Sequence, residues 1–129
     1  WLHVEDHCRG LRLVLEKGTF GQTYNIGGDQ EMSNLALVKA ICEVLDELSP
    51  RNDGEKHSKG ITFVEDRPGH DFRYAIDSTK IREQLRWRPQ RSFEQDLKTT
   101  VEWYLDNKPW WHSILDGSYR LERLRRTSI

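Results

Sequence analysis

Apolar residues recur at helical spacing along most of this chain of 129 residues. The clearest series lies between 35 and 48, where apolar side chains three and four positions apart fall on one helical face. Ser33 or Asn34 can cap this helix, and Pro50 stops it. The pattern predicts three further helices: one that follows an N-cap at Asp6 and ends at Gly18, one from 78 to 85, and one that opens at 92 and reaches 105.

Short β-branched or alternating runs between the helices predict strands at 1–4, 22–26, 61–64 and 74–76. Strands that alternate with helices are typical of an α/β fold. Three or four short strands would not close a sheet alone, and the chain begins at Trp1 without an initiator methionine. We therefore expect residues 1–129 to be one domain of a longer protein.

Composition and net charge restrict the function only at the level of broad partner classes and compartment. A net charge of −1 with 32% charged residues predicts no bulk attraction to nucleic acid or to a membrane surface. No apolar run approaches the roughly 20 residues that span a bilayer, and we expect no signal peptide. Cys8 and Cys42 both fall in predicted helices, which suggests buried thiols in a reducing compartment. A cytoplasmic protein is the simplest interpretation.

The densest polar chemistry lies between the predicted strands at 61–64 and 74–76, in the run Asp66-Arg67-Pro68-Gly69-His70. Arg67 offers a planar fork of donors suited to phosphate, and His70 can donate or accept near neutral pH. Pro68-Gly69 predicts a turn. The run is typical of an anion-binding loop, although an Arg-Asp ion pair that ties down a surface turn stays open.

Other candidate sites are weaker. Gly27-Gly28 lacks the spacing of a dinucleotide-binding or P-loop motif, which favours a turn. His3 and His7 do not match the His-Glu-x-x-His metal pattern, which favours structural roles and no metal. Residues 51–60 are polar and turn-rich and predict a flexible loop. The basic tail 119–129 favours an amphipathic end over nucleic-acid binding, because Leu121 and Leu124 separate its arginines.

Several sequence blocks together resemble the C-terminal part of the dTDP-glucose 4,6-dehydratase family. Some are shared with other extended short-chain dehydrogenases that act on nucleotide sugars, whereas the Asp-Arg-Pro-Gly-His-Asp block is the most specific. The blocks are Trp1-Leu-His-Val-Glu-Asp-His7, Thr23-Tyr-Asn-Ile-Gly-Gly28, Asp66-Arg-Pro-Gly-His-Asp71, Tyr74-Ala-Ile-Asp77 and Thr100-Val-Glu-Trp-Tyr104.

The resemblance implies the C-terminal substrate-binding portion of a cytoplasmic, typically dimeric lyase that uses NAD. Such enzymes convert dTDP-glucose to dTDP-4-keto-6-deoxyglucose, on the way to dTDP-rhamnose and other deoxysugars. The family's NAD-binding and catalytic groups lie in an N-terminal Rossmann domain, which has no counterpart here. The chain alone is therefore expected to be inactive. Its apolar faces would be exposed, so we expect the isolated chain to self-associate or to be only marginally stable.

The resemblance also implies half of a substrate site. Arg67 and His70 would hold the dTDP diphosphate, Pro68-Gly69 would let the backbone approach it, and Asp66 would brace Arg67. Asn34 matches an asparagine near the nucleotide and can also cap its helix. Asp6 matches the family's Val-x-Asp block, which favours a structural cap over a substrate contact. Two alternatives remain: a fragment of another nucleotide-sugar epimerase or dehydratase, and a stand-alone nucleotide-sugar-binding or interaction module.

Overall fold

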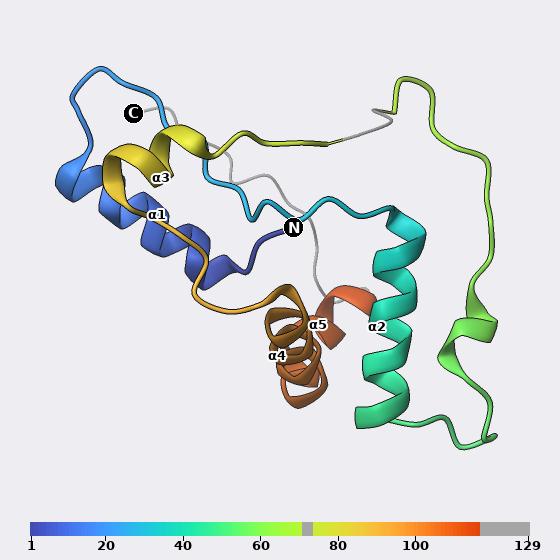
Figure 1. Ribbon diagram of the computed structural model, residues 1–129. Helices are drawn as coiled ribbons and strands as arrows, with labels where there is room; N and C mark the ends of the chain where they lie inside the picture. The colour runs from blue at the N-terminus through green and yellow to red at the C-terminus, as the bar shows by residue number, and fades with distance from the viewer. Residues whose placement is uncertain (71–73, 117–129) are drawn as a thin grey trace, which may run out of the picture.

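The computed structural model describes residues 1–70 and 74–116. These residues form α1 (Val4–Lys17), α2 (Asn34–Leu48), the 3-10 helix η1 (His57–Gly60), α3 (Thr79–Leu85), α4 (Phe93–Asp106) and α5 (Lys108–Leu115). Helix α1 packs against α3, while α4 packs against both α2 and α5 (Figure 1). In this view α1 and α3 lie on the left and α2 lies on the right, and long connections at the top join the two sides.

The helices predicted from apolar spacing are confirmed, and local capping explains most of their ends. Ser33 Oγ accepts a hydrogen bond from Ala36 N at 3.1 Å, so Ser33 caps α2. Asn34 is the first helical residue, and the prediction that it could be the cap is wrong. Ser92 and Gln95 form a capping box at the start of α4. At the end of α1, the N–H of Gly18 bonds the carbonyl of Val14.

The prediction that Asp6 caps α1 is wrong, because the helix already begins at Val4, two residues before Asp6. His3 is the N-cap, and its Nδ1 accepts from Glu5 N at 3.3 Å. The Asp6 carboxylate is buried within the first turn, where it accepts from Gln90 N at 3.2 Å and from the Arg9 side chain. Trp87 Nε1 donates to the Asp6 carbonyl at 3.2 Å. Asp6 therefore ties α1 to the connection between α3 and α4.

The α/β class is not confirmed, because the described residues contain no assigned strand. The segments 22–28 and 74–78 do run close together, but they are joined by side-chain hydrogen bonds. Ser78 Oγ donates to Gly27 O at 3.2 Å, and Asn25 Nδ2 donates to Asp77 O at 3.3 Å. A strand needs a neighbour for its backbone ladder. Alternating side chains predict an extended backbone, not the partner that would pair with it.

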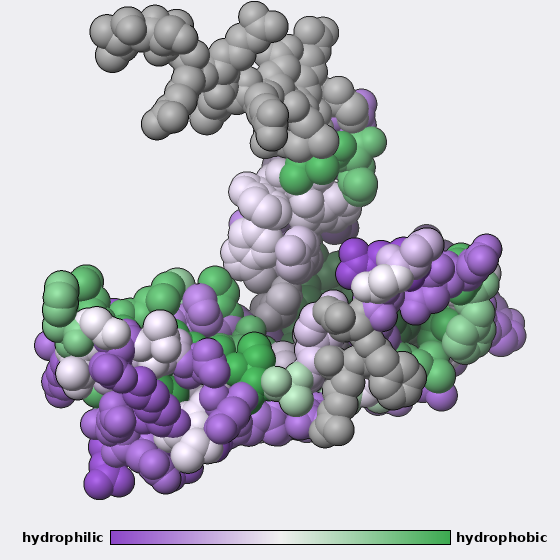
Figure 2. Space-filling model, turned by 90° about the horizontal axis from the view of Figure 1, so that it is seen from above, coloured by the Kyte–Doolittle hydropathy of each residue, from purple (hydrophilic) through white to green (hydrophobic). Residues whose placement is uncertain are grey.

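The core formed by the described residues is small. The buried apolar side chains are Cys42, Ile81, Trp87 and Val101, whereas many large apolar side chains are exposed. Figure 2 accordingly shows green apolar patches open to solvent among the purple polar surface. The prediction that both thiols are buried is half wrong: Cys42 is buried, but Cys8 lies on the exposed side of α1. Both described cysteines are free thiols.

Two further predictions concern segments outside the main helices. The polar stretch 51–60 ends in η1, which packs against α2, and His57 N donates to Asp46 Oδ1 at 2.8 Å. Its flexibility stays a prediction. The basic tail 119–129 lies outside the described residues. No helix in the described part of the chain is long and apolar enough to cross a membrane.

Candidate functional site

The predicted anion-binding run forms a tight turn in the connection between η1 and α3, along the outer edge of the molecule (Figure 1). His70 N donates to Arg67 O at 3.3 Å, and Gly69 lies between them with φ +72°. Pro68 followed by a left-handed glycine is the signature of a type II β-turn. An alanine at position 69 would have space for its Cβ but would strain the backbone. The turn brings the side chains on either side of it together.

Asp66 and His70 form the closest side-chain contact of this loop. His70 Nδ1 lies 2.7 Å from Asp66 Oδ1, and the same carboxylate accepts the Arg67 N–H at 2.8 Å. The hydrogen bond from His70 holds the pKa of Asp66 below its ordinary value, and the Arg67 N–H adds to this effect. Asp66 is therefore a carboxylate at neutral pH and acts only as an acceptor.

The Arg67 side chain is exposed, and it has no ion pair with any residue in 1–70 or 74–116. Asp66 contacts the backbone of Arg67 and the ring of His70, so it does not brace the guanidinium directly. Among residues 1–70 and 74–116, no ion pair joins Arg67 to an aspartate. No described residue bonds the five donors of the guanidinium, so they are available to an anion beside the turn.

Asn34 is exposed at the first position of α2. Among the described residues, no hydrogen bond joins it to the turn at 66–70. The N-terminal end of α2 carries no acidic side chain in its first turn. Unpaired backbone N–H groups at such an end favour a negatively charged group. Asn34 therefore stays a predicted nucleotide contact, and the structure brings only Asp66, Arg67, Pro68, Gly69 and His70 into one turn.

The glycine pair does not form a cradle for a dinucleotide. A Cβ on Gly28 would lie 2.1 Å from the carbonyl oxygen of Trp1, and one on Gly27 would lie 3.0 Å from Ser78 Oγ. The space beside both glycines is thus filled by the chain itself, so the pair does not suit NAD. The described residues also contain no group of three or more His, Cys, Asp or Glu side chains placed to hold a metal ion.

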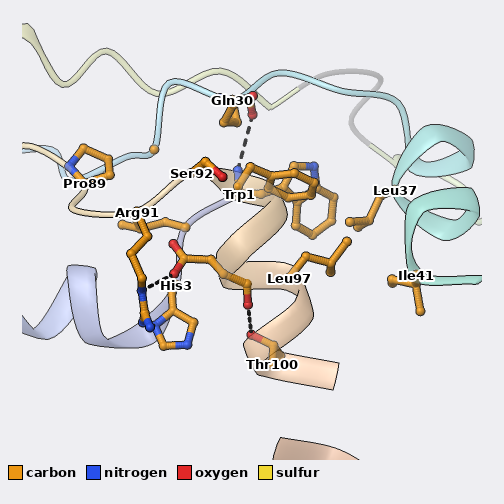
Figure 3. A pocket seen from close by; sticks show the side chains of 14 residues that line it. Trp1, His3, Gln30, Leu37, Ile41, Pro89, Arg91, Ser92, Leu97 and Thr100 are labelled. Carbon is orange, nitrogen blue, oxygen red and sulfur yellow. Dashed lines mark hydrogen bonds and ion pairs between the residues drawn. The ribbon is translucent and has the colours of Figure 1, made fainter. Parts of the chain in front are cut away.

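A pocket of about 440 Å³ that the sequence did not predict lies between the first residues, α2 and α4 (Figure 3). Leu37, Ile41 and Leu97 line its apolar side. On its polar side, Arg91 lies 3.0 Å from Glu5 Oε2 and 2.8 Å from Asp96 Oδ1. The Arg91 guanidinium is therefore already paired with two carboxylates and is not a free cation for an anion in this pocket.

Sequence reasoning missed the residues that hold these elements together. Arg91 lies in a connector without periodicity, so no local pattern indicated that it links α1 to α4. Gly10 did offer a signal, since an isolated glycine within a helical pattern often marks a close approach. A Cβ at Gly10 would lie 3.0 Å from the Ile26 side chain and 3.1 Å from Trp87 Nε1.

Comparison with known proteins gives matches over nearly the whole chain. The family model described as GDP-mannose 4,6 dehydratase matches residues 1–100. The dTDP-glucose 4,6-dehydratase of Neisseria meningitidis serogroup B is 55% identical over 126 residues, which cover 96% of this chain and 36% of that protein. The enzyme of the same name from Xanthomonas campestris pv. campestris is 52% identical over 127 residues, which cover 98% and 36%.

Solved structures give a similar result. The dTDP-glucose 4,6-dehydratase of Bacillus anthracis in complex with NAD matches with a TM-score of 0.76 and 42% identity. DesIV, the dTDP-glucose 4,6-dehydratase of Streptomyces venezuelae solved with NAD and TYD bound, matches with a TM-score of 0.77 and 39% identity. Each match covers 88% of this chain and 33% of the other. The chain thus spans about a third of the length of the relatives it matches.

Proposed function

The chain belongs to the GDP-mannose 4,6 dehydratase family, and we propose that it is the C-terminal substrate-binding part of a dTDP-glucose 4,6-dehydratase. In this role it would hold the diphosphate of dTDP-glucose while an N-terminal Rossmann domain converts the sugar to its 4-keto-6-deoxy form. The identities of 52% and 55% to dTDP-glucose 4,6-dehydratases favour this substrate over those of other nucleotide-sugar enzymes.

One observation carries the proposal: a single turn carries the exposed Arg67 and, three positions on, the His70 imidazole held by a carboxylate. A diphosphate is an extended dianion, and a guanidinium fork binds its oxygens with two parallel hydrogen bonds. Pro68 and Gly69 would set the turn that positions these donors. Asn34 would contact the nucleotide at the start of α2, where the helix dipole favours negative charge.

The exposed apolar residues support an intramolecular partner. Phe63 and Val64 are 80% and 85% exposed, and Tyr74 and Ile76 are more than half exposed. All four lie outside the helices, in segments that form no strand with another described segment. In the proposed whole enzyme, the Rossmann domain would cover these segments and bind NAD, the hydride carrier of the reaction. The enzyme would be a cytoplasmic lyase and a homodimer, and this chain alone would be inactive.

A chimeric enzyme tests this function directly. This chain replaces the matched third of the Neisseria meningitidis dTDP-glucose 4,6-dehydratase, and conversion of dTDP-glucose to the 4-keto-6-deoxy sugar is followed. We expect the chimera to be active, because the two sequences are 55% identical over 126 residues. The parent relative is the positive control. The relative lacking its matched third should be inactive.

The alternative nucleotide sugars are separated by binding measurements on the 129-residue chain. Affinity for dTDP should exceed that for GDP, UDP and CDP. Tighter binding of GDP would favour the activity that names the family model. A folded chimera without activity, together with a chain that binds none of the four nucleotides at millimolar concentration, would contradict the proposal.

The Gly69 turn gives a second test. Gly69→Ala places a Cβ in a left-handed conformation, which costs about 1–2 kcal/mol. We expect dTDP-glucose affinity to fall roughly tenfold, because the variant favours turn geometries that separate Arg67 from His70. Gly54→Ala is the matched control, since Gly54 also has a positive φ, +73°, and open space at its Cβ. Titration calorimetry should show a loss only for Gly69→Ala.

A further inference from the structure

The hydrogen bond between Asp66 and His70 fixes which ring nitrogen of His70 carries its proton. Asp66 is an ionised acceptor, so the proton in the 2.7 Å contact belongs to His70 Nδ1. A neutral imidazole has only one N–H, and here Asp66 uses it. The remaining nitrogen, Nε2, then carries a lone pair and cannot donate to an anion. It becomes a donor only when the ring takes up a second proton.

We propose that Asp66 is a positioning residue that restricts His70 to binding the substrate diphosphate as an imidazolium, which makes nucleotide-sugar affinity depend on pH. This inference rests on the proposed function and names the regulation of the same site. Asp66 would contribute through the His70 ring, whereas Arg67 would bind at every physiological pH because its guanidinium stays charged.

The local charges support this arrangement. The charged side chains near His70 in the described loop are Glu65, Asp66 and Arg67, and only Asp66 bonds the ring. No described helix contributes a hydrogen bond or ion pair to His70. The His70 side chain is 28% exposed and that of Asp66 is 76% exposed. The ring can thus exchange protons with solvent while it stays bound to the carboxylate.

The direction of the pH effect follows from linkage. Because the diphosphate binds the imidazolium and not the neutral ring, binding takes up a proton, so affinity rises as pH falls. A charge-assisted hydrogen bond predicts that affinity decreases by roughly ten- to a hundredfold between about pH 5 and 8. The probe is dTDP-glucose, because the terminal phosphate of dTDP would itself titrate in this range.

Variants of the 129-residue chain separate the roles of the two residues. His70→Gln supplies an uncharged donor, so its affinity should not change with pH. Asp66→Asn keeps an acceptor but removes the charge that stabilises the imidazolium, so the midpoint of the affinity curve should move to lower pH. His112→Gln is the matched control, since His112 Nδ1 lies 3.6 Å from Asp116 Oδ2 in the same i,i+4 relation.

The outcomes distinguish this inference from the proposed function. A merely structural role for Asp66 predicts that Asp66→Asn weakens binding equally at every pH, and this result would overturn the inference while the proposed function stands. Equal pH profiles for the parent chain and His70→Gln would overturn it as well. If dTDP-glucose binds at no pH, to the chain or to the chimera, both are wrong.

Discussion

Replacing Ile81 by alanine is expected to lower the free energy of unfolding by about 2–5 kcal/mol. Ile81 lies in α3 and is 0% exposed, one of two side chains in the described residues that are completely buried. Helix α3 packs against α1, and only a few other apolar side chains are buried. The cavity would therefore remove a large fraction of a net stability that is usually 5–15 kcal/mol.

Urea unfolding followed by tryptophan fluorescence measures this effect, because Trp87 is buried and Ile81 belongs to the same small core. The control is Ile114→Ala, the same substitution in α5, where the side chain is 51% exposed. Its effect should stay within about 0.5 kcal/mol. Equal urea midpoints for Ile81→Ala and the parent chain would mean that the contact between α1 and α3 does not stabilise the isolated chain.

The helices were predictable because their signals are local. Apolar spacing set α2, and capping residues such as Ser33 and Ser92 lie within three positions of the groups they bond. Asp6 shows the limit of this approach. It is a good capping residue by type, but its carboxylate bonds Gln90, 84 positions away. Nothing near Asp6 in the sequence indicated that partner.

The strands could not be confirmed for a related reason. The alternating pattern at 22–26 and the β-branched run at 61–64 indicate that these side chains suit an extended backbone, but pairing depends on segments that are distant in sequence. In the described residues, segments 22–28 and 74–78 are close, yet Gly27 and Asp77 bond to side chains instead of to each other's backbone. Secondary structure of this kind is specified by the partner as much as by the segment.

The turn at the candidate site was predictable, whereas its contacts were not. Pro68-Gly69 dictates a type II turn almost alone. The same turn returns His70 to Asp66, and this contact replaces the expected one between Asp66 and Arg67. The adjacent positions of Asp66 and Arg67 in the sequence suggested that these two side chains would pair. In the structure Asp66 instead bonds His70, four positions along the chain, and the Arg67 guanidinium stays exposed.

Replacing Arg67 by alanine is expected to weaken dTDP-glucose binding on the order of a hundredfold, because a bidentate charge-assisted contact to the diphosphate is lost. Arg67→Lys should retain part of the affinity, since lysine keeps the charge but not the planar fork. The fold should be unaffected, because the Arg67 side chain is exposed and makes no ion pair with another described residue. Titration calorimetry on the chain, and KM in the chimera, measure the loss.

The matched control is Arg51→Ala, which removes an exposed guanidinium from the loop between α2 and η1, where Asp53 binds it. This variant should bind dTDP-glucose like the parent chain. The comparison matters because any loss of positive charge weakens binding of a dianion slightly, and salt screens such long-range effects. A direct contact predicts a large difference between the two arginine variants that persists at high salt. Equal, salt-sensitive losses would show that Arg67 acts only through the net charge of the chain.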